Sequence, residues 1–117
     1  MAGNPNLAIT RTAQYFKAFN EKKLKSLSTL YSSGVILKDW VGEWVGIDNV
    51  LNENRKLFQN EFILTVENTK ITFDEDMNMN RTISDIIIEI NGETIKAVDD
   101  ILFDNNNKIY SITAYKR

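Results

Sequence analysis

The first twenty residues have the hydrophobic spacing of an amphipathic helix. Asn4 followed by Pro5 is typical of a helix start, because asparagine caps free backbone amides and proline lacks the N–H that would stay unpaired there. Behind this start, apolar residues recur at intervals of three and four, at Ile9, Ala13, Phe16 and Phe19. The spacing predicts a helix that turns this apolar stripe toward a core.

Two further helices and a short strand are predicted before residue 60. Apolar residues continue at helical spacing at Leu24, Leu27, Leu30 and Tyr31. Residues 32–34, Ser-Ser-Gly, are expected to end this second helix, and residues 35–37, Val-Ile-Leu, favour a short strand that leads to Asp39. A third helix is predicted after Gly46, with an apolar side formed by Ile47, Val50, Leu51, Leu57 and Phe58.

After Phe58 the hydrophobic period changes from that of a helix to that of a strand. Four runs rich in Ile, Val, Thr and Phe are predicted as strands, at residues 62–73, 81–90, 94–103 and 109–115. Asn91-Gly92 predicts a two-residue hairpin, and the asparagines 105–107 tolerate the left-handed backbone that the next hairpin needs. Residues 1–117 are therefore expected to form one α+β domain, with three N-terminal helices on a curved, mostly antiparallel sheet.

Composition excludes several kinds of chemistry. The 117 residues include no histidine and no cysteine, so a Ser-His-Asp triad, a thiolate nucleophile and the usual zinc sites are ruled out. We expect no metal and no cofactor. A formal net charge of -2 without a basic face argues against nucleic acid. With no signal peptide or membrane span in the sequence, we expect a cytoplasmic protein that does not bind membranes.

Several stretches resemble a known superfamily. They are residues 15–20 (Tyr-Phe-Lys-Ala-Phe-Asn), 35–39 (Val-Ile-Leu-Lys-Asp), 98–104 (Val-Asp-Asp-Ile-Leu-Phe-Asp), 108–109 and 114–115. Together they are similar to the nuclear transport factor 2-like superfamily, and within it to the ketosteroid isomerase and SnoaL-like polyketide cyclase branches. The resemblance implies a cone-shaped fold whose helices and bent sheet enclose an apolar pocket.

The resemblance also implies roles for three residues. Asp39 matches the base that shuttles a proton, while Tyr15 and Asp99 match the two donors that stabilise a dienolate oxygen. Such an enzyme moves a double bond into conjugation with a ketone, chemistry that needs no histidine. Strand alternation independently places Asp99 on the same face as Ala97 and Ile101, among apolar neighbours that raise the pKa of a carboxyl group.

The same resemblance gives an expected ligand-binding set around these three. Its members are Phe19, Tyr31, Trp40, Trp44, Asn54, Phe58, Ala97, Ile101, Ile112 and Ala114. The two tryptophans are open to another interpretation, because they can serve as well in the core or in a dimer contact as at a pocket mouth. Glu53 and Asp48 are expected on a solvated helix face.

Several functions fit this pattern. The leading hypothesis is a homodimeric pocket protein that binds a small apolar carbonyl compound and transfers a proton as ketosteroid isomerases do. One alternative is a SnoaL-like cyclase, and another is a non-catalytic ligand-binding or assembly module of the same fold. An epoxide-hydrolase-like site would need an Asp-Arg-Asp set, for which Arg81 is the available arginine on the interior strands.

Overall fold

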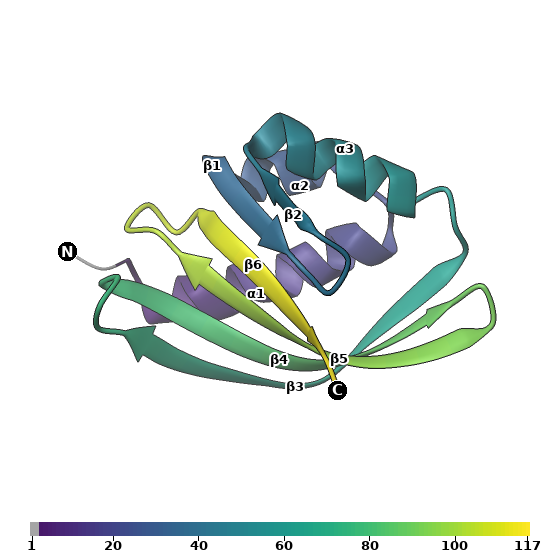
Figure 1. Ribbon diagram of the computed structural model, residues 1–117. Coiled ribbons are helices and arrows are strands. Elements are labelled where there is room, and N and C mark those ends of the chain that lie inside the picture. The colour runs from purple at the N-terminus through teal and green to yellow at the C-terminus, as the bar shows by residue number, and fades with distance from the viewer. Residues whose placement is uncertain (1–2) are drawn as a thin grey trace.

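The computed structural model describes residues 3–117 and places three helices against one face of a six-stranded sheet (Figure 1). The elements are α1 (Pro5–Asn20), α2 (Leu24–Leu30), β1 (Tyr31–Lys38), β2 (Glu43–Val45), α3 (Ile47–Leu57), β3 (Phe62–Asp74), β4 (Met79–Ile90), β5 (Glu93–Phe103) and β6 (Ile109–Lys116). The strand order is β2-β1-β6-β5-β4-β3, and neighbours are antiparallel except for the parallel pair β1–β6. The predicted α+β class is confirmed.

Helix α1 begins as predicted, but it turns a different stripe toward the sheet. The Asn4 side chain accepts the Asn6 N–H at 2.9 Å, and Pro5 is the first helical residue. The predicted stripe is half right: Phe16 and Phe19 are buried, whereas Ile9 is 45% exposed and Ala13 is exposed. The helix also buries Ala8, Thr12, Tyr15 and Ala18. No helix within residues 3–117 is long and apolar enough to cross a membrane.

The buried stripe of α1 contains a polar residue whose hydrogen bonds are satisfied. The Thr12 hydroxyl donates to the Ala8 carbonyl at 2.8 Å and lies 2.8 Å from the Thr82 hydroxyl on β4. A buried hydroxyl with partners on both sides costs little to bury. Thr12 can therefore face the sheet, and this rotation of α1 brings Tyr15 into the middle of the buried face.

The segment after α2 differs from its prediction. The helix ends at Leu30 and β1 starts at Tyr31, so residues 32–34 lie within a strand instead of ending a helix. Parallel pairing with β6, as between Leu37 and Ile112, supplies backbone partners for β1 that the local sequence does not reveal. The three-residue strand β2, which pairs antiparallel with β1, was not predicted.

The antiparallel meander from β3 to β6 follows its prediction to within two residues at each strand end. Asn91 and Gly92 have φ of 49° and 84°, the left-handed pair that a type I′ hairpin requires. Asn107, with φ of 59°, serves the β5–β6 turn in the same way. Long strands β3 to β5 bend around the helices, all of which lie on the concave face (Figure 1).

Alternation along β5 separates two neighbouring aspartates. Asp99 is 5% exposed on the concave face, whereas Asp100 lies on the opposite face. There Arg81 binds both Asp100 (Nε to Oδ1, 2.9 Å) and Asp74 (Nη2 to Oδ2, 2.8 Å). The arginine that an epoxide-hydrolase-like site would need therefore points away from Asp99, and that alternative is wrong.

Candidate functional site

A cavity of about 240 Å³ lies between α1, α3, the loop after β1 and the concave face of the sheet. Its wall is mainly aliphatic and aromatic, and it is lined by Tyr15, Phe19, Leu37, Asp39, Trp40, Val41, Glu53, Asn54, Leu57, Phe62, Leu64, Ile86, Ile88, Ile90, Ile95, Asp99, Ile112 and Ala114. Trp40 and Val41, at 43% and 76% exposed, mark the mouth. Two wider and shallower depressions elsewhere are lined by mostly polar side chains.

The cavity brings together the three residues for which the sequence predicts chemistry. Tyr15 reaches it from α1, Asp99 from the centre of β5, and Asp39 from the loop that follows β1. Tyr15 and Asp99 are buried, at 3% and 5% exposed, while Asp39 is half-buried. Two acids and a phenol from distant parts of the chain thus face one apolar space.

The loop after β1 fixes the Asp39 carboxylate. Its Oδ1 accepts the Val41 N–H at 2.7 Å and the Gly42 N–H at 3.0 Å. The Asp39 N–H donates to the Gly42 carbonyl at 3.0 Å, which closes the turn. In the described part of the chain, the second oxygen, Oδ2, accepts no hydrogen bond. One oxygen therefore holds the side chain in place and the other stays available to a ligand.

The Asp99 carboxyl group has an unusual environment. Its pKa is raised from 3.8 to about 7, mainly by burial and in smaller part by the nearby charge of Asp39. None of residues 3–117 forms a hydrogen bond with this carboxyl group. Near neutral pH much of the Asp99 population therefore carries a proton, and the group can act as a hydrogen-bond donor toward the cavity.

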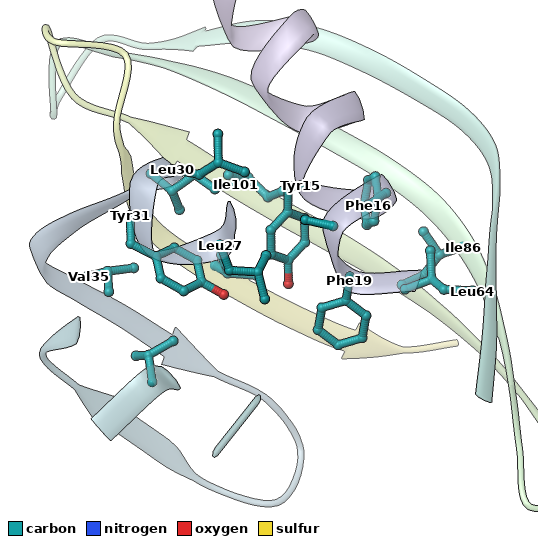
Figure 2. Packing of buried hydrophobic residues seen from close by; sticks show 14 of the residues in the cluster. Tyr15, Phe16, Phe19, Leu27, Leu30, Tyr31, Val35, Leu64, Ile86 and Ile101 are labelled. Atoms are coloured by element: carbon teal, nitrogen blue, oxygen red, sulfur yellow. The ribbon is translucent and has the colours of Figure 1, made fainter. Parts of the chain in front are cut away.

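Tyr15 belongs to a cluster of aromatic side chains that includes Phe19 and Tyr31 (Figure 2). Its ring centroid lies 5.7 Å from that of Phe19 and 6.4 Å from that of Tyr31. The Tyr31 hydroxyl donates to Asn54 Oδ1 at 2.7 Å, so this pair is satisfied internally. Burial raises the pKa of Tyr15 well above 10, and Tyr31 and Asp99 raise it further. Tyr15 thus stays a protonated donor, and its hydroxyl is engaged by no residue in the described range.

Half of the residues expected to bind the ligand line the cavity, and half do not. Five of these residues line the cavity: Phe19, Trp40, Asn54, Ile112 and Ala114. The other five lie outside the lining: Tyr31, Trp44, Phe58, Ala97 and Ile101. Ala97 and Ile101 are fully buried in the core, and the Phe58 ring packs behind Phe19 and Phe62, with centroids 5.2 and 5.8 Å away. Trp44 packs against the core.

Sequence reasoning missed one charged member of the wall. Glu53 lines the cavity and is half-buried, so the prediction of a solvated face for it is wrong. No local pattern in the sequence signals this placement, because it depends on how α3 packs over the cavity. Among residues 3–117 no group of three or more His, Cys, Asp or Glu side chains is arranged to hold a metal ion.

Comparison with solved structures identifies the fold. A nuclear transport factor 2-like protein of unknown function from Cytophaga hutchinsonii superposes with a TM-score of 0.77 at 16% identity, covering 94% of this chain and 89% of that one. A steroid delta-isomerase from Pseudomonas aeruginosa gives 0.74 at 13% identity, covering 95% and 80%. The Orange Carotenoid Protein of Anabaena, solved binding canthaxanthin, gives 0.80 at 16% identity, covering 89% of this chain and 35% of that one.

These similarities establish that the chain has the nuclear transport factor 2-like fold, as its sequence resemblance implied. No protein-family model matches the chain, and no curated protein matches it either. The class defined by fold and site together is a cone-shaped protein with an apolar cavity that contains acidic and phenolic groups.

The environment of Asp99 leads to a direct prediction. In an NMR titration of side-chain carboxyl carbons, Asp99 should titrate with a midpoint of about 7. Asp39→Asn should lower that midpoint, because the substitution removes the negative charge that disfavours ionisation of Asp99. Asp48→Asn, which removes an exposed carboxylate outside the cavity, is the matched control and should leave it unchanged. A wild-type midpoint near 3.8 would contradict the burial of this group.

Proposed function

We propose that this protein is an isomerase of the ketosteroid isomerase type, which moves the double bond of a small β,γ-unsaturated ketone into conjugation with the carbonyl. One observation carries the proposal: Asp39, Tyr15 and Asp99 line the same apolar cavity, where burial raises the pKa of both Tyr15 and Asp99 and so favours the protonated form that a hydrogen-bond donor needs. Neighbours of the same fold include a steroid delta-isomerase, which supports the choice of reaction.

In the first step Asp39 Oδ2 takes a proton from the carbon between the carbonyl and the double bond. The electron pair of that C–H bond forms a new C–C double bond, and the carbonyl π electrons move onto oxygen, giving a dienolate. The dienolate then collapses to the conjugated ketone as Asp39 returns the same proton to the γ carbon. Asp39 ends as it began, and substrate and product have the same composition.

The dienolate oxygen is stabilised by two donors, the Tyr15 hydroxyl and the protonated Asp99 carboxyl. The aliphatic walls exclude water, which strengthens both hydrogen bonds. Because Asp99 donates only when it carries its proton, turnover is expected to fall as the pH rises above about 7. Ionisation of Asp99 would also repel the negative oxygen that it otherwise stabilises.

The volume of the cavity sets the size of the substrate. An apolar cavity of roughly 150 Å³ holds one benzene molecule, which has six non-hydrogen atoms. In proportion, a cavity of about 240 Å³ accommodates about ten non-hydrogen atoms. A monocyclic or bicyclic ketone therefore fits inside, whereas a four-ring steroid would have to extend past Trp40 and Val41 into solvent.

A second candidate is a non-catalytic protein that binds a carbonyl compound in the same cavity. It is favoured by the likeness to the Orange Carotenoid Protein, which has been solved binding canthaxanthin. In that case Tyr15 and Asp99 would hold a carbonyl oxygen and Asp39 would remove no proton. A cyclase of the SnoaL-like type would use the same carboxylate and the same donors on a different substrate, so an assay of double-bond migration separates these possibilities.

The proposed function predicts turnover of a β,γ-unsaturated octalone, a bicyclic ketone of suitable size, to the conjugated isomer, followed by ultraviolet absorbance. Asp39→Asn should abolish turnover because it removes the base, yet it should retain binding of 2-naphthol, a flat phenol that mimics the dienolate. Tyr15→Phe should lower kcat by about two to three orders of magnitude, the usual cost of losing one oxyanion donor.

Asp48→Asn serves again as the control and should react at the wild-type rate. The isomerase assignment is wrong if the wild type shows no rate above buffer with several small ketones, or if Asp39→Asn is as fast as the wild type. Binding of 2-naphthol without any turnover would favour the non-catalytic candidate.

We also propose that two copies of the chain associate through the convex face of the sheet. No helix of the described chain covers this face, and its half-exposed aliphatic residues include Ile83, Val98 and Leu102 (Figure 1). An isologous dimer buries the same patch on both copies. This face carries both an acidic residue, Asp85, and a basic residue, Lys96, so its charges do not oppose self-association.

Light scattering should then give twice the chain mass of 13.5 kDa at micromolar concentration. Val98→Arg should shift the protein to the monomer, because it places two like charges in the buried interface. Lys25→Glu, at an exposed position on α2 on the other side of the sheet, should leave the dimer intact. A wild-type mass near 13.5 kDa would exclude this association.

A further inference from the structure

The charged residues that line the cavity are all acidic. The lining residues include three carboxyl groups, those of Asp39, Glu53 and Asp99, and no lysine or arginine. One of these carboxyl groups is deeply buried: Asp99 is 5% exposed and lacks a hydrogen-bond partner in the described chain. A ligand therefore meets two carboxyl groups, Asp39 and Glu53, that form no ion pair within residues 3–117, and a third, Asp99, that has no hydrogen-bond partner there.

Glu53 contributes most directly to the charge at the rim. Glu53 lies on α3 next to Asn54. Glu53 is half-buried whereas Asn54 is only 3% exposed, so Glu53 lies nearer to solvent. Its chain neighbours Arg55 and Lys56 are exposed, and the Arg55 guanidinium lies 3.5 Å from Asn52 Oδ1. No cation within residues 3–117 approaches the Glu53 carboxylate to 4.0 Å. Glu53 has no role in the isomerase reaction proposed above.

Aromatic rings in the cavity wall already attract cations from outside it. Lys116 Nζ lies 5.5 Å from the ring centroid of Trp40, and Lys22 Nζ lies 5.4 Å from that of Phe62. Neither lysine belongs to the cavity lining, and Lys22 also donates to the Asn60 carbonyl at 2.7 Å. The Trp40 ring at the mouth is thus already in contact with the Lys116 ammonium, so a cationic ligand would pair with Glu53 and not with this ring.

We infer that the ligand of this cavity carries a positive charge, as a protonated amine, at the end that meets Glu53. The amine donates hydrogen bonds to the Glu53 carboxylate, and the electrostatic attraction is enhanced because this carboxylate is half-buried. The position of the carbonyl end, at Tyr15 and Asp99, rests on the proposed function. The charge preference rests on the lining alone.

The inference also makes Glu53 a specificity determinant against anions. A ligand that carries a carboxylate at the same end would face Glu53 and Asp39 at close range, and like charges disfavour binding. A neutral ketone is neither attracted nor repelled by Glu53, so its affinity should lie between those of a cationic and an anionic ligand. Three ligands of nearly equal size and different charge therefore test the inference.

The test uses 4-(aminomethyl)acetophenone, 4-ethylacetophenone and 4-acetylbenzoate, whose para substituents are cationic, neutral and anionic at pH 7. Dissociation constants are measured by titration calorimetry with the full chain. We expect the amine to bind about tenfold more tightly than the ethyl compound, as for a hydrogen bond to a charged group. The carboxylate should bind more weakly than the ethyl compound.

Glu53→Gln keeps the size and the hydrogen-bonding capacity of the side chain while it removes the charge. In this variant the ratio of the Kd values for the ethyl compound and the amine should fall to near one. Asp48→Asn removes one negative charge from the exposed start of the same helix and should keep the wild-type ratio. A ratio near one in the wild type, or an unchanged ratio in Glu53→Gln, overturns the inference.

Failure of the inference and failure of the proposed function give different results. If wild type isomerises the octalone but binds the amine and ethyl compounds equally, the charge preference is wrong and the isomerase assignment stands. If no ketone is isomerised but the amine binds about tenfold more tightly through Glu53, the charge preference stands and the isomerase assignment is wrong. If none of the three acetophenones binds, the inference is overturned.

Discussion

The buried carboxyl group of Asp99 constrains the rest of the site. A carboxylate removed from water without a charged or hydrogen-bonding partner is so unfavourable that the group retains its proton instead, and its pKa rises to about 7. This state requires the concave face of the sheet around β5 to be closed off from water, and the neighbouring strand residues Ala97 and Ile101 are fully buried there. It also requires a space into which the acid can donate, which the cavity provides.

The rotation of α1 determines what shares that space with Asp99. Because the Thr12 hydroxyl is satisfied by Ala8 and Thr82, a polar residue can face the sheet and Tyr15 comes to lie at the centre of the buried stripe. The turn after β1 then positions Asp39 through two backbone amides bonded to one oxygen. Local hydrogen bonds therefore hold the base, while burial determines the protonation of the two donors.

The fold could be predicted from the sequence because its signals are local. The Asn4-Pro5 start, the Asn91-Gly92 turn and the change of hydrophobic period each follow from near neighbours. The sequence resemblance also indicated Tyr15, Asp39 and Asp99, which the structure brings to one cavity.

What could not be predicted depends on tertiary contacts. The stripe of α1 was displaced by a hydroxyl pair 70 residues apart in sequence, and β1 begins at Tyr31, which pairs with Ile109 of β6, before the ladder resumes at Ile36. Glu53 lines the cavity because of where α3 packs, and no local sequence pattern predicts that packing.

The central claim is best tested by the pH dependence of the free energy of unfolding of the wild type and of Asp99→Asn, from urea denaturation. Because the folded-state pKa of Asp99 lies above its unfolded value, the folded protein binds more protons between about pH 4 and 7. The stability from this group is complete below pH 4 and is lost as the pH rises through 7. Relative to the variant, wild-type stability should decline by up to about 1.4 kcal/mol per pH unit in this window. Parallel curves for the two proteins would contradict the account.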